Sequence, residues 1–260
     1  MDRIYRIEHD GAARHVIERD GALSLLEGDL FGLYRPGKII GRVEAPGARP
    51  GVARLLAPIR PSKIVGVGLN YRDHAAEVGK PLPKEPLIFI KPSTAVIGPG
   101  DPIRIPPTAG RVDHEAELAV VIGRRASSVP RERAREVIFG ITCSNDVTAR
   151  EMQRRGVQYS HCKGYDTFAP LGPCILVGTD GSAADVEGWV NGHRRQASNS
   201  RELIFAIDEL VAYISSVMTL LPGDVISTGT PAGIGPLVPG DTVTVRVEGV
   251  GELTNPVVAG

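Results

Sequence analysis

The sequence predicts an α+β fold with a strand-rich body, few helices and a small β-rich N-terminal region. Two observations carry this prediction. Most apolar residues fall in short alternating or continuous runs bounded by Gly, Pro, Asn and Asp, which is typical of strands. Helical stripes are isolated, so the chain lacks the regular strand and helix alternation of a doubly wound fold.

The first segment, residues 1–55, is expected to form the small β region. The stretches "RIYRIEHDG" and "RHVIERDG" both end in Asp-Gly, which is a hairpin signal. The stretch "EAPGARPG" (44–51) is rich in Pro and Gly and resembles a linker. Residues 56–260 are then expected to form the main domain.

The main domain is expected to begin with buried strands. "KIVGVGLN" and "PLIFIKP" are apolar runs of strand length, and "PIRIPP" is a short extended segment. Towards the C-terminus, "DVISTGTPAG" and "DTVTVRVEG" return to strand. The second of these alternates Thr and Val, which indicates a half-exposed strand.

Two helices are predicted from their end signals or their periodicity. "PRERAREVIFG" has Pro at its start and Gly at its end, where helices favour them. The range 199–221 is the clearest helix, because its apolar residues recur at steps of three and four. Asn199 and Glu202 are placed to cap it, and Pro222-Gly223 would stop it. The stripe consists of Leu203, Ile207, Leu210, Ile214, Val217 and Leu221.

Composition excludes several classes of protein. A formal net charge of +0 and 5% aromatic residues give no support for nucleic acid or anionic membrane binding. No apolar run approaches the roughly 20 residues of a membrane helix, and the N-terminus has no signal core. The three cysteines lack metal-type spacing and are odd in number. A soluble, cytoplasmic protein is expected.

The stretch "VDHEAELAVVIG" (112–123) places carboxylates on one face of an otherwise apolar strand. Asp113, Glu115 and Glu117 alternate, so they project to the same side. Buried anions so close together need protonation, Arg or Lys partners, or a cation. An exposed edge strand whose acids face water is the alternative.

A second acidic position follows in "GITCSNDVTAREMQRRG", which reads as strand, turn and helix. Asp146 would occupy the helix N-cap, and Asp146, Arg150 and Gln153 would share one helical face. Simple capping and a solvated surface are the alternatives.

Two further segments carry candidate catalytic groups. In "GLNYRDHAAEVGK", His74 and Glu77 are three residues apart, so one helical turn would let the carboxylate orient the imidazole. In "HCKGYDTFAPLGP", Lys163 lies among small, aromatic and proline residues. The alternatives are a surface ion pair and a snorkelling surface lysine.

Together these segments, with "IFIKPSTAVIGPGDPI", "STGTPAGIG" and "VEGVGELTNPV", resemble the fumarylacetoacetate hydrolase family from about Pro61 to the C-terminus. The resemblance implies a mixed β-roll, usually dimeric, with a divalent cation at its mouth. Carried over residue by residue, it implies metal ligands at Glu115, Glu117 and Asp146, catalytic residues at His74, Glu77 and Lys163, and substrate-binding residues at Arg150, Gln153 and Thr230. The all-carboxylate set suits a hard ion, with Mg²⁺ expected first and Mn²⁺ or Ca²⁺ next.

The activity implied by the resemblance is metal-dependent hydrolysis of a carbon–carbon bond in acylpyruvate or fumarylpyruvate-type 2-oxo acids, as part of aromatic or sugar-acid breakdown. Oxaloacetate decarboxylation and isomerisation of a 2-hydroxyhepta-2,4-diene-1,7-dioate are alternatives within the family, because both pass through a similar enolate. Retention of both His74 and Glu77 favours hydrolysis. A binding protein that keeps the fold without turnover is the alternative from another class.

Overall fold

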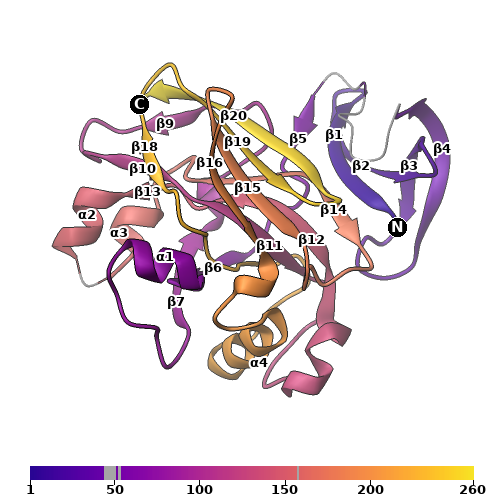
Figure 1. Cartoon of the computed structure of the whole chain (residues 1–260). Coiled ribbons are helices and arrows are strands. Elements are labelled where there is room, and N and C mark those ends of the chain that lie inside the picture. The colour runs from indigo at the N-terminus through magenta and orange to yellow at the C-terminus, as the bar shows by residue number, and fades with distance from the viewer. Residues whose placement is uncertain (44–50, 52–53, 157) are drawn as a thin grey trace.

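The computed structural model describes residues 1–43, 51, 54–156 and 158–260. Its strands form mixed sheets, and the described helices are few and short, which confirms the predicted fold class. The described strands make up one large sheet and two smaller ones. Figure 1 shows the N-terminal strands at one edge of the molecule and helices α1 to α3 on the opposite side.

The N-terminal strands form consecutive antiparallel hairpins, as predicted. Asp10-Gly11 and Asp20-Gly21 make the first two turns with positive φ at both residues, the conformation of a two-residue hairpin turn. The predicted linker, 44–51, lies outside the described residues except for Gly51. The strands are β1 (Arg3–His9), β2 (Ala12–Arg19), β3 (Ala22–Gly28), β4 (Tyr34–Arg42) and β5 (Leu55–Leu56).

The large sheet continues from these hairpins into the body of the molecule, because β1 pairs with β14. The order is β4-β3-β2-β1-β14-β12-β11-β17-β6-β7, with β5 beside β1 and β8 beside β14. The proposed division at residue 55 stays a prediction. The body strands are β6 (Lys63–Gly68), β7 (Leu87–Pro92), β8 (Val96–Ile97), β11 (Ala116–Ile122), β12 (Ile138–Asn145), β14 (Ala169–Val177) and β17 (Val225–Ser227).

Strand β11 lies at the centre of the core and is buried along its whole length. Leu118 and Val120 belong to one hydrophobic cluster, whereas Ala119 and Val121 belong to another. Both faces of the sheet are therefore covered at this strand, which is why its sequence after Glu117 is continuously apolar rather than alternating.

Two smaller sheets complete the strand-rich body. One has the order β13-β10-β18 and the other β16-β15-β19-β20-β9. Strand β19 alternates buried and exposed residues, as its Thr/Val pattern predicted. The strands are β9 (Ile103–Ile105), β10 (Val112–His114), β13 (Thr148–Ala149), β15 (Asp185–Val190), β16 (His193–Asn199), β18 (Gly235–Leu237), β19 (Thr242–Val247) and β20 (Gly251–Ala259).

The predicted strand at 112–123 is interrupted at Glu115, which separates β10 from β11. The Glu115 amide donates to the side chain of Asn145, and its carbonyl accepts from the Asp146 amide. These bonds join Glu115 to the segment that carries Asp146. Asp113, Glu115 and Glu117 are all buried, so the exposed-edge alternative is wrong.

The helix predicted at 199–221 is shorter than its apolar stripe. Helix α4 spans Ile207–Val217, and a 3₁₀ turn at Ser200–Glu202 precedes it, capped by Asn199. Between the two, Asn70 binds the backbone amide and carbonyl of Phe205 and prevents a continuous helix. Val217 and Leu221, at the end of the stripe, are exposed.

The other helix predictions need correction as well. "PRERAREVIFG" forms a 3₁₀ helix over Arg131–Val137. The helix ends there because β12 begins at Ile138 and pairs with β11. Asp146 is not an N-cap, since β13 intervenes and helix α2 begins only at Arg150. The remaining helices are α1 (Arg72–Glu77), α2 (Arg150–Arg155), α3 (Ser160–Lys163) and a 3₁₀ turn, Ser93–Ala95. No helix in the described part of the chain is long and apolar enough to cross a membrane.

Candidate metal centre

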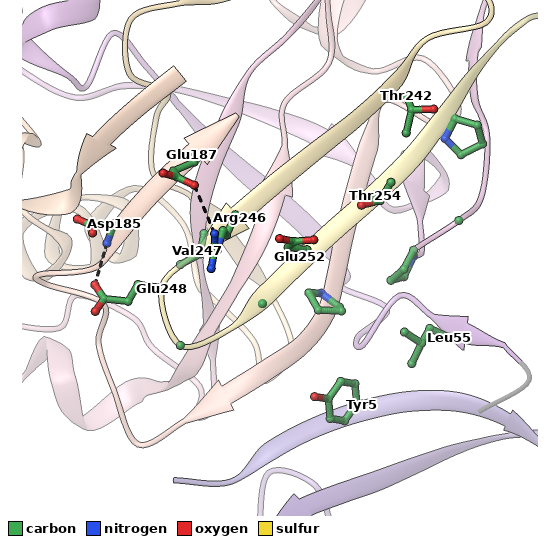
Figure 2. A pocket seen from close by; sticks show the side chains of 16 residues that line it. Tyr5, Leu55, Asp185, Glu187, Thr242, Arg246, Val247, Glu248, Glu252 and Thr254 are labelled. Carbon is green, nitrogen blue, oxygen red and sulfur yellow. Dashed lines mark hydrogen bonds and ion pairs between the residues drawn. The ribbon is translucent and has the colours of Figure 1, made fainter. Parts of the chain in front are cut away.

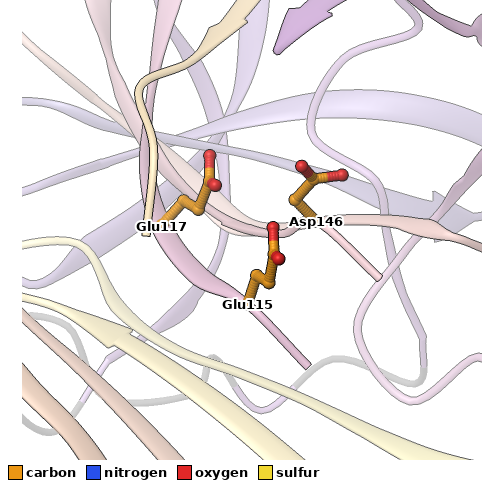
Figure 3. Close-up of side chains that lie close together, drawn as sticks. All are labelled: Glu115, Glu117 and Asp146. Carbon is orange, nitrogen blue, oxygen red and sulfur yellow. The ribbon is translucent and has the colours of Figure 1, made fainter. Parts of the chain in front are cut away.

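Three carboxylates converge at the break between β10 and β11 (Figure 3). Glu115 lies at the break, Glu117 on β11, and Asp146 just after β12. One oxygen of each lies within 4.8 Å of the others, and all three residues are buried. The donors are hard oxygens and include no Cys or His, which fits Mg²⁺, Mn²⁺ or Ca²⁺ rather than a soft transition metal.

Glu117 is held through one of its two oxygens. Its Oε2 accepts from the Ser227 hydroxyl at 2.5 Å and from the Gly229 amide at 3.0 Å. Gly229 has φ +107°, and a Cβ there would lie 2.7 Å from the Cβ of Asn70, so glycine is required at this position. The second oxygen of Glu117 is left for a metal ion.

Two lysines hold Asp146 and Glu115. Lys163 Nζ donates to Glu115 Oε2 at 2.8 Å and to Asp146 Oδ2 at 2.5 Å. Lys91 binds the other oxygen of Asp146 and also donates to the Phe168 carbonyl at 2.6 Å. Burial opposes a charged Lys163, but the Asp146 and Glu115 carboxylates prevail and raise the pKa of Lys163. The surface-lysine alternative for Lys163 is therefore wrong, since its side chain is 4% exposed.

Arg150 connects the centre to the first turn of α2. It pairs with Glu115 and with Asp113 Oδ2 at 2.9 Å, and its Nη1 donates to Gln153 Oε1 at 2.9 Å. Burial raises the pKa of Glu115 in principle, but the Lys163 and Arg150 charges outweigh it and lower that pKa well below its usual value. The alternative of a solvated Arg150 surface is wrong, because its side chain is 12% exposed.

The predicted histidine–carboxylate pair forms within α1. His74 Nδ1 lies 2.8 Å from Glu77 Oε2, and Glu77 Oε1 accepts from the Gly233 amide at 2.9 Å. An ionised carboxylate only accepts, so Nδ1 carries the hydrogen and Nε2 is left with a free lone pair. The His74 side chain is 9% exposed, so this is not an ordinary surface ion pair.

Most of these groups line one pocket of about 270 Å³. It is lined by Glu115, Glu117 and Lys163, by His74, and by all three predicted substrate-binding residues, Arg150, Gln153 and Thr230. Thr230 is already engaged, because its hydroxyl donates to the Ala116 carbonyl and accepts from Gln196. The hydroxyl proton of Thr230 is therefore already donated in this structure.

A larger groove of about 920 Å³ lies between the N-terminal strands and the β19–β20 hairpin (Figure 2). None of the predicted site residues lines it. Its charged side chains include a Glu187–Arg246 ion pair, and Glu248 accepts from the Asp185 amide. The smaller pocket is the candidate functional site, because Glu115, Glu117, His74 and Lys163 line it.

Sequence reasoning missed Lys91 and Arg111 and set Asp113 aside. Asp113 is buried, binds both Arg111 and Arg150, and so positions the arginine that reaches Glu115. The sequence gives one weak indication that Lys91 is functional, because it is the only charged residue in the apolar strand β7. A lysine at the end of a strand is ordinarily interpreted as snorkelling to solvent.

Metal binding is expected to release a proton from Glu117. Burial, and then the Asp146 and Glu115 carboxylates, raise the pKa of Glu117 to about 8, so the metal-free carboxyl is protonated at neutral pH. A ligand must be deprotonated, so apparent affinity should rise by up to about tenfold per pH unit below that pKa and level off above it. Calorimetric Mn²⁺ titration in buffers of different ionisation enthalpy should report about one proton released near neutral pH and almost none at high pH. Identical heats in all buffers near neutral pH would contradict this assignment.

Comparison with known proteins identifies a family and several similar proteins. The model of the fumarylacetoacetate (FAA) hydrolase C-terminal family matches residues 63–258. An uncharacterized protein of Archaeoglobus fulgidus is 52% identical over 202 residues, covering 78% of this chain and 81% of the relative.

Two solved structures are also similar. A 5-carboxymethyl-2-hydroxymuconate delta-isomerase from Mycobacterium smegmatis is 45% identical, with a TM-score of 0.87 over 99% of this chain and 100% of that chain. A maleylpyruvate hydrolase from Sphingobium sp. SYK-6, solved with manganese(II) and pyruvate, is 30% identical, with a TM-score of 0.77 over 99% of both chains.

Proposed function

The chain belongs to the fumarylacetoacetate hydrolase family, and on that premise we propose that it is a Mg²⁺-dependent hydrolase of acylpyruvate or fumarylpyruvate-type 2-oxo acids. The observation that carries the proposal is His74, which lines the same pocket as Glu115, Glu117 and Lys163 and is bound through Nδ1 by Glu77. A hydrolase needs a base for water, whereas a decarboxylase does not.

The substrate would be held and oriented by the inner part of the pocket. Arg150 and Gln153 offer donors to the carboxylate end of a 2-oxo acid. A divalent ion held by the three carboxylates would, when bound, stabilise negative charge on the substrate oxygens as a Lewis acid. The Lys163 ammonium adds a second positive charge beside the enolate oxygen that develops as the carbon–carbon bond breaks.

Water activation is assigned to His74. Its Nε2 accepts a proton from water while Glu77 stabilises the resulting imidazolium through Nδ1. The resulting hydroxide attacks the distal carbonyl, and the bond between that carbon and the pyruvate unit breaks with its electron pair passing to the pyruvate enolate. The proton held by His74 is then returned to the enolate carbon, which gives pyruvate and a carboxylic acid. The Gly233 amide fixes Glu77, so the imidazole keeps its orientation.

A second candidate is an isomerase or an oxaloacetate decarboxylase. The likeness to a delta-isomerase at 45% identity supports the isomerase. The metal carboxylates and Lys163 would serve either reaction, because both stabilise an enolate.

Product identity separates these activities. Purified protein with Mg²⁺ should convert acetylpyruvate or fumarylpyruvate into pyruvate and the corresponding acid, and a Glu115→Ala variant should not. Release of CO₂ from oxaloacetate, or isomerisation of a hydroxydienedioate, without any acylpyruvate cleavage would overturn the proposal. The homodimer that the family resemblance implies stays a prediction, which light scattering in solution would check.

A further inference from the structure

The segment 228–234, which connects β17 to β18, joins the metal centre to the histidine–carboxylate pair. Its Gly229 amide donates to Glu117 Oε2 at 3.0 Å, and its Gly233 amide donates to Glu77 Oε1 at 2.9 Å. The segment lies outside the described strands, so no sheet ladder fixes its shape. The spacing between the metal ligand and the pair therefore depends on what holds the middle of this segment.

A buried side chain on β16, Gln196, holds the middle of the segment. Its Nε2 donates to the Thr230 hydroxyl at 2.7 Å and to the Pro231 carbonyl at 2.8 Å. Its Oε1 accepts from the Ala116 amide at 2.9 Å and from His114 Nδ1 at 3.0 Å. Gln196 is 1% exposed and uses both ends of its carboxamide.

Backbone groups fix which way the Gln196 carboxamide points. The Ala116 amide only donates and the Pro231 carbonyl only accepts, so an exchange of Oε1 and Nε2 would break both bonds. In the chain, Ala116 lies between the metal ligands Glu115 and Glu117. Gln196 thus ties the backbone that carries two metal ligands to the segment that reaches the histidine–carboxylate pair.

Two glycines give Gln196 room to reach both partners. Gly188 is opposite Gln196 in the β15–β16 ladder, and a Cβ there would lie 2.8 Å from Gln196 Oε1. Gly233 has φ +100°, and a Cβ there would lie 2.0 Å from the Arg195 carbonyl oxygen. The close approach of β16 to its neighbours therefore requires that both positions lack a side chain.

We propose that Gln196 is a positioning residue for the reaction. It holds Thr230, which lines the pocket, in place. It also keeps the Gly233 amide on Glu77, which orients His74. Gln196 is not part of the described lining of the pocket, so it acts through these residues and not on the substrate. The inference rests on the proposed function, because it assigns a role in the same site.

Turnover tests the proposal through a double-mutant cycle. Gln196→Met removes all four hydrogen bonds while keeping the length of the side chain. It should lower kcat for acylpyruvate cleavage by about ten- to a hundredfold, because a displaced base is poorly aligned with its water. In a His74→Gln background the same change should lower kcat by less than about threefold, because two residues that act through one base are not additive.

Hydrogen exchange, followed by mass spectrometry on the Mn²⁺-loaded protein, tests the proposal without turnover. Gln196→Met should speed exchange by roughly tenfold in peptides that cover 228–234 and α1, whereas α4 should exchange as in the wild type. Mn²⁺ affinity should stay close to wild type. The Ser227 hydroxyl still binds Glu117, and the Thr228 amide still donates to the Leu118 carbonyl, without help from Gln196.

Ser200→Ala is the matched control. Ser200 is 4% exposed and directly follows β16. Its hydroxyl donates to the Gly181 carbonyl at 2.5 Å and accepts from the Ala184 amide at 2.9 Å. Loss of these buried hydrogen bonds should destabilise the protein without changing kcat or the exchange of 228–234.

Gln196→Glu provides the same test if Gln196→Met does not fold. It keeps an acceptor for the Ala116 amide and replaces only the donor to Thr230 and Pro231. The loss of kcat and the faster local exchange should therefore both appear in this variant as well.

The outcomes separate this inference from the proposed function. Suppose that acylpyruvates are cleaved, but that Gln196→Met lowers kcat equally with and without His74, or leaves exchange of 228–234 and α1 unchanged. The inference is then overturned and the hydrolase assignment stands. Exchange that rises locally in Gln196→Met and not in Ser200→Ala, in a protein that cleaves no acylpyruvate, supports the positioning role and overturns the hydrolase assignment.

Discussion

Replacing Asp146 with asparagine is expected to abolish high-affinity metal binding and turnover together. The carboxylate is one of only three in the metal centre, and both of its oxygens are bound by buried lysines, Lys91 and Lys163. The neutral amide would weaken attraction for a dication and leave two ammonium groups facing a group without charge. Breaking a buried ion pair in this way costs about 3–5 kcal/mol of stability.

Thermal unfolding with and without Mn²⁺ distinguishes loss of the metal site from general destabilisation. The wild-type protein should gain about 2.7 kcal/mol when the ion is present at a hundred times its Kd, and Asp146→Asn should gain almost nothing. Asp113→Asn is the matched control, because Asp113 is equally buried and ion-paired but lies outside the metal cluster. It should lose stability and still respond to Mn²⁺. A persistent metal response in Asp146→Asn would contradict the assignment of this residue as a ligand.

The buried carboxylates of residues 112–123 are tolerated because neighbouring cationic side chains neutralise Asp113 and Glu115 without a metal ion. Lys163, on α3, binds both Glu115 and Asp146, and Arg150, on α2, pairs with Glu115. Glu117 has no cationic partner among the described side chains and takes up a proton instead, which is the physical meaning of its raised pKa. One acid in the centre is thus kept neutral until a dication replaces its proton.

Strand positions could be predicted from the sequence because burial of a strand determines the pattern of apolar residues within that strand. The apolar run of β11 after Glu117 reflects coverage of both sheet faces, and the alternation of β19 reflects coverage of one. Helix limits could not be predicted in the same way. The start of α4 at Ile207 is decided by Asn70, which binds the backbone of Phe205 from 135 residues away, and periodicity holds no information about such a contact.

Among the site residues, too, contacts within one segment could be predicted, whereas contacts between distant segments could not. The His74–Glu77 pair is local, so one helical turn sufficed to predict its geometry. Asp146 looked like a helix cap because its true partners, Lys91 and Lys163, come from segments distant in sequence. The family resemblance corrected its role, but Lys91 escaped notice because nothing nearby distinguishes it from a lysine at the end of a strand.

Replacing His74 with glutamine is expected to lower the rate of acylpyruvate hydrolysis by about 10²–10⁴-fold, the usual contribution of a general base. Glutamine approximates the size and hydrogen bonding of the imidazole but cannot accept a proton from water. Mn²⁺ affinity should remain close to wild type, because His74 is not part of the cluster of convergent carboxylates. Initial rates with acetylpyruvate, together with a Mn²⁺ titration of the same preparation, would measure both quantities.

Two further variants serve as comparisons for His74→Gln. Glu77→Gln should cause a smaller loss than His74→Gln, because it removes the carboxylate that orients the imidazole and supports its charge but leaves the base itself. His161→Gln alters an exposed histidine on α3 that does not line the pocket, so it should leave the rate unchanged. If His74→Gln retained the wild-type rate while Lys163→Met abolished it, water activation would have to be reassigned. The metal centre and Lys163 would then support hydrolysis without His74 as the base.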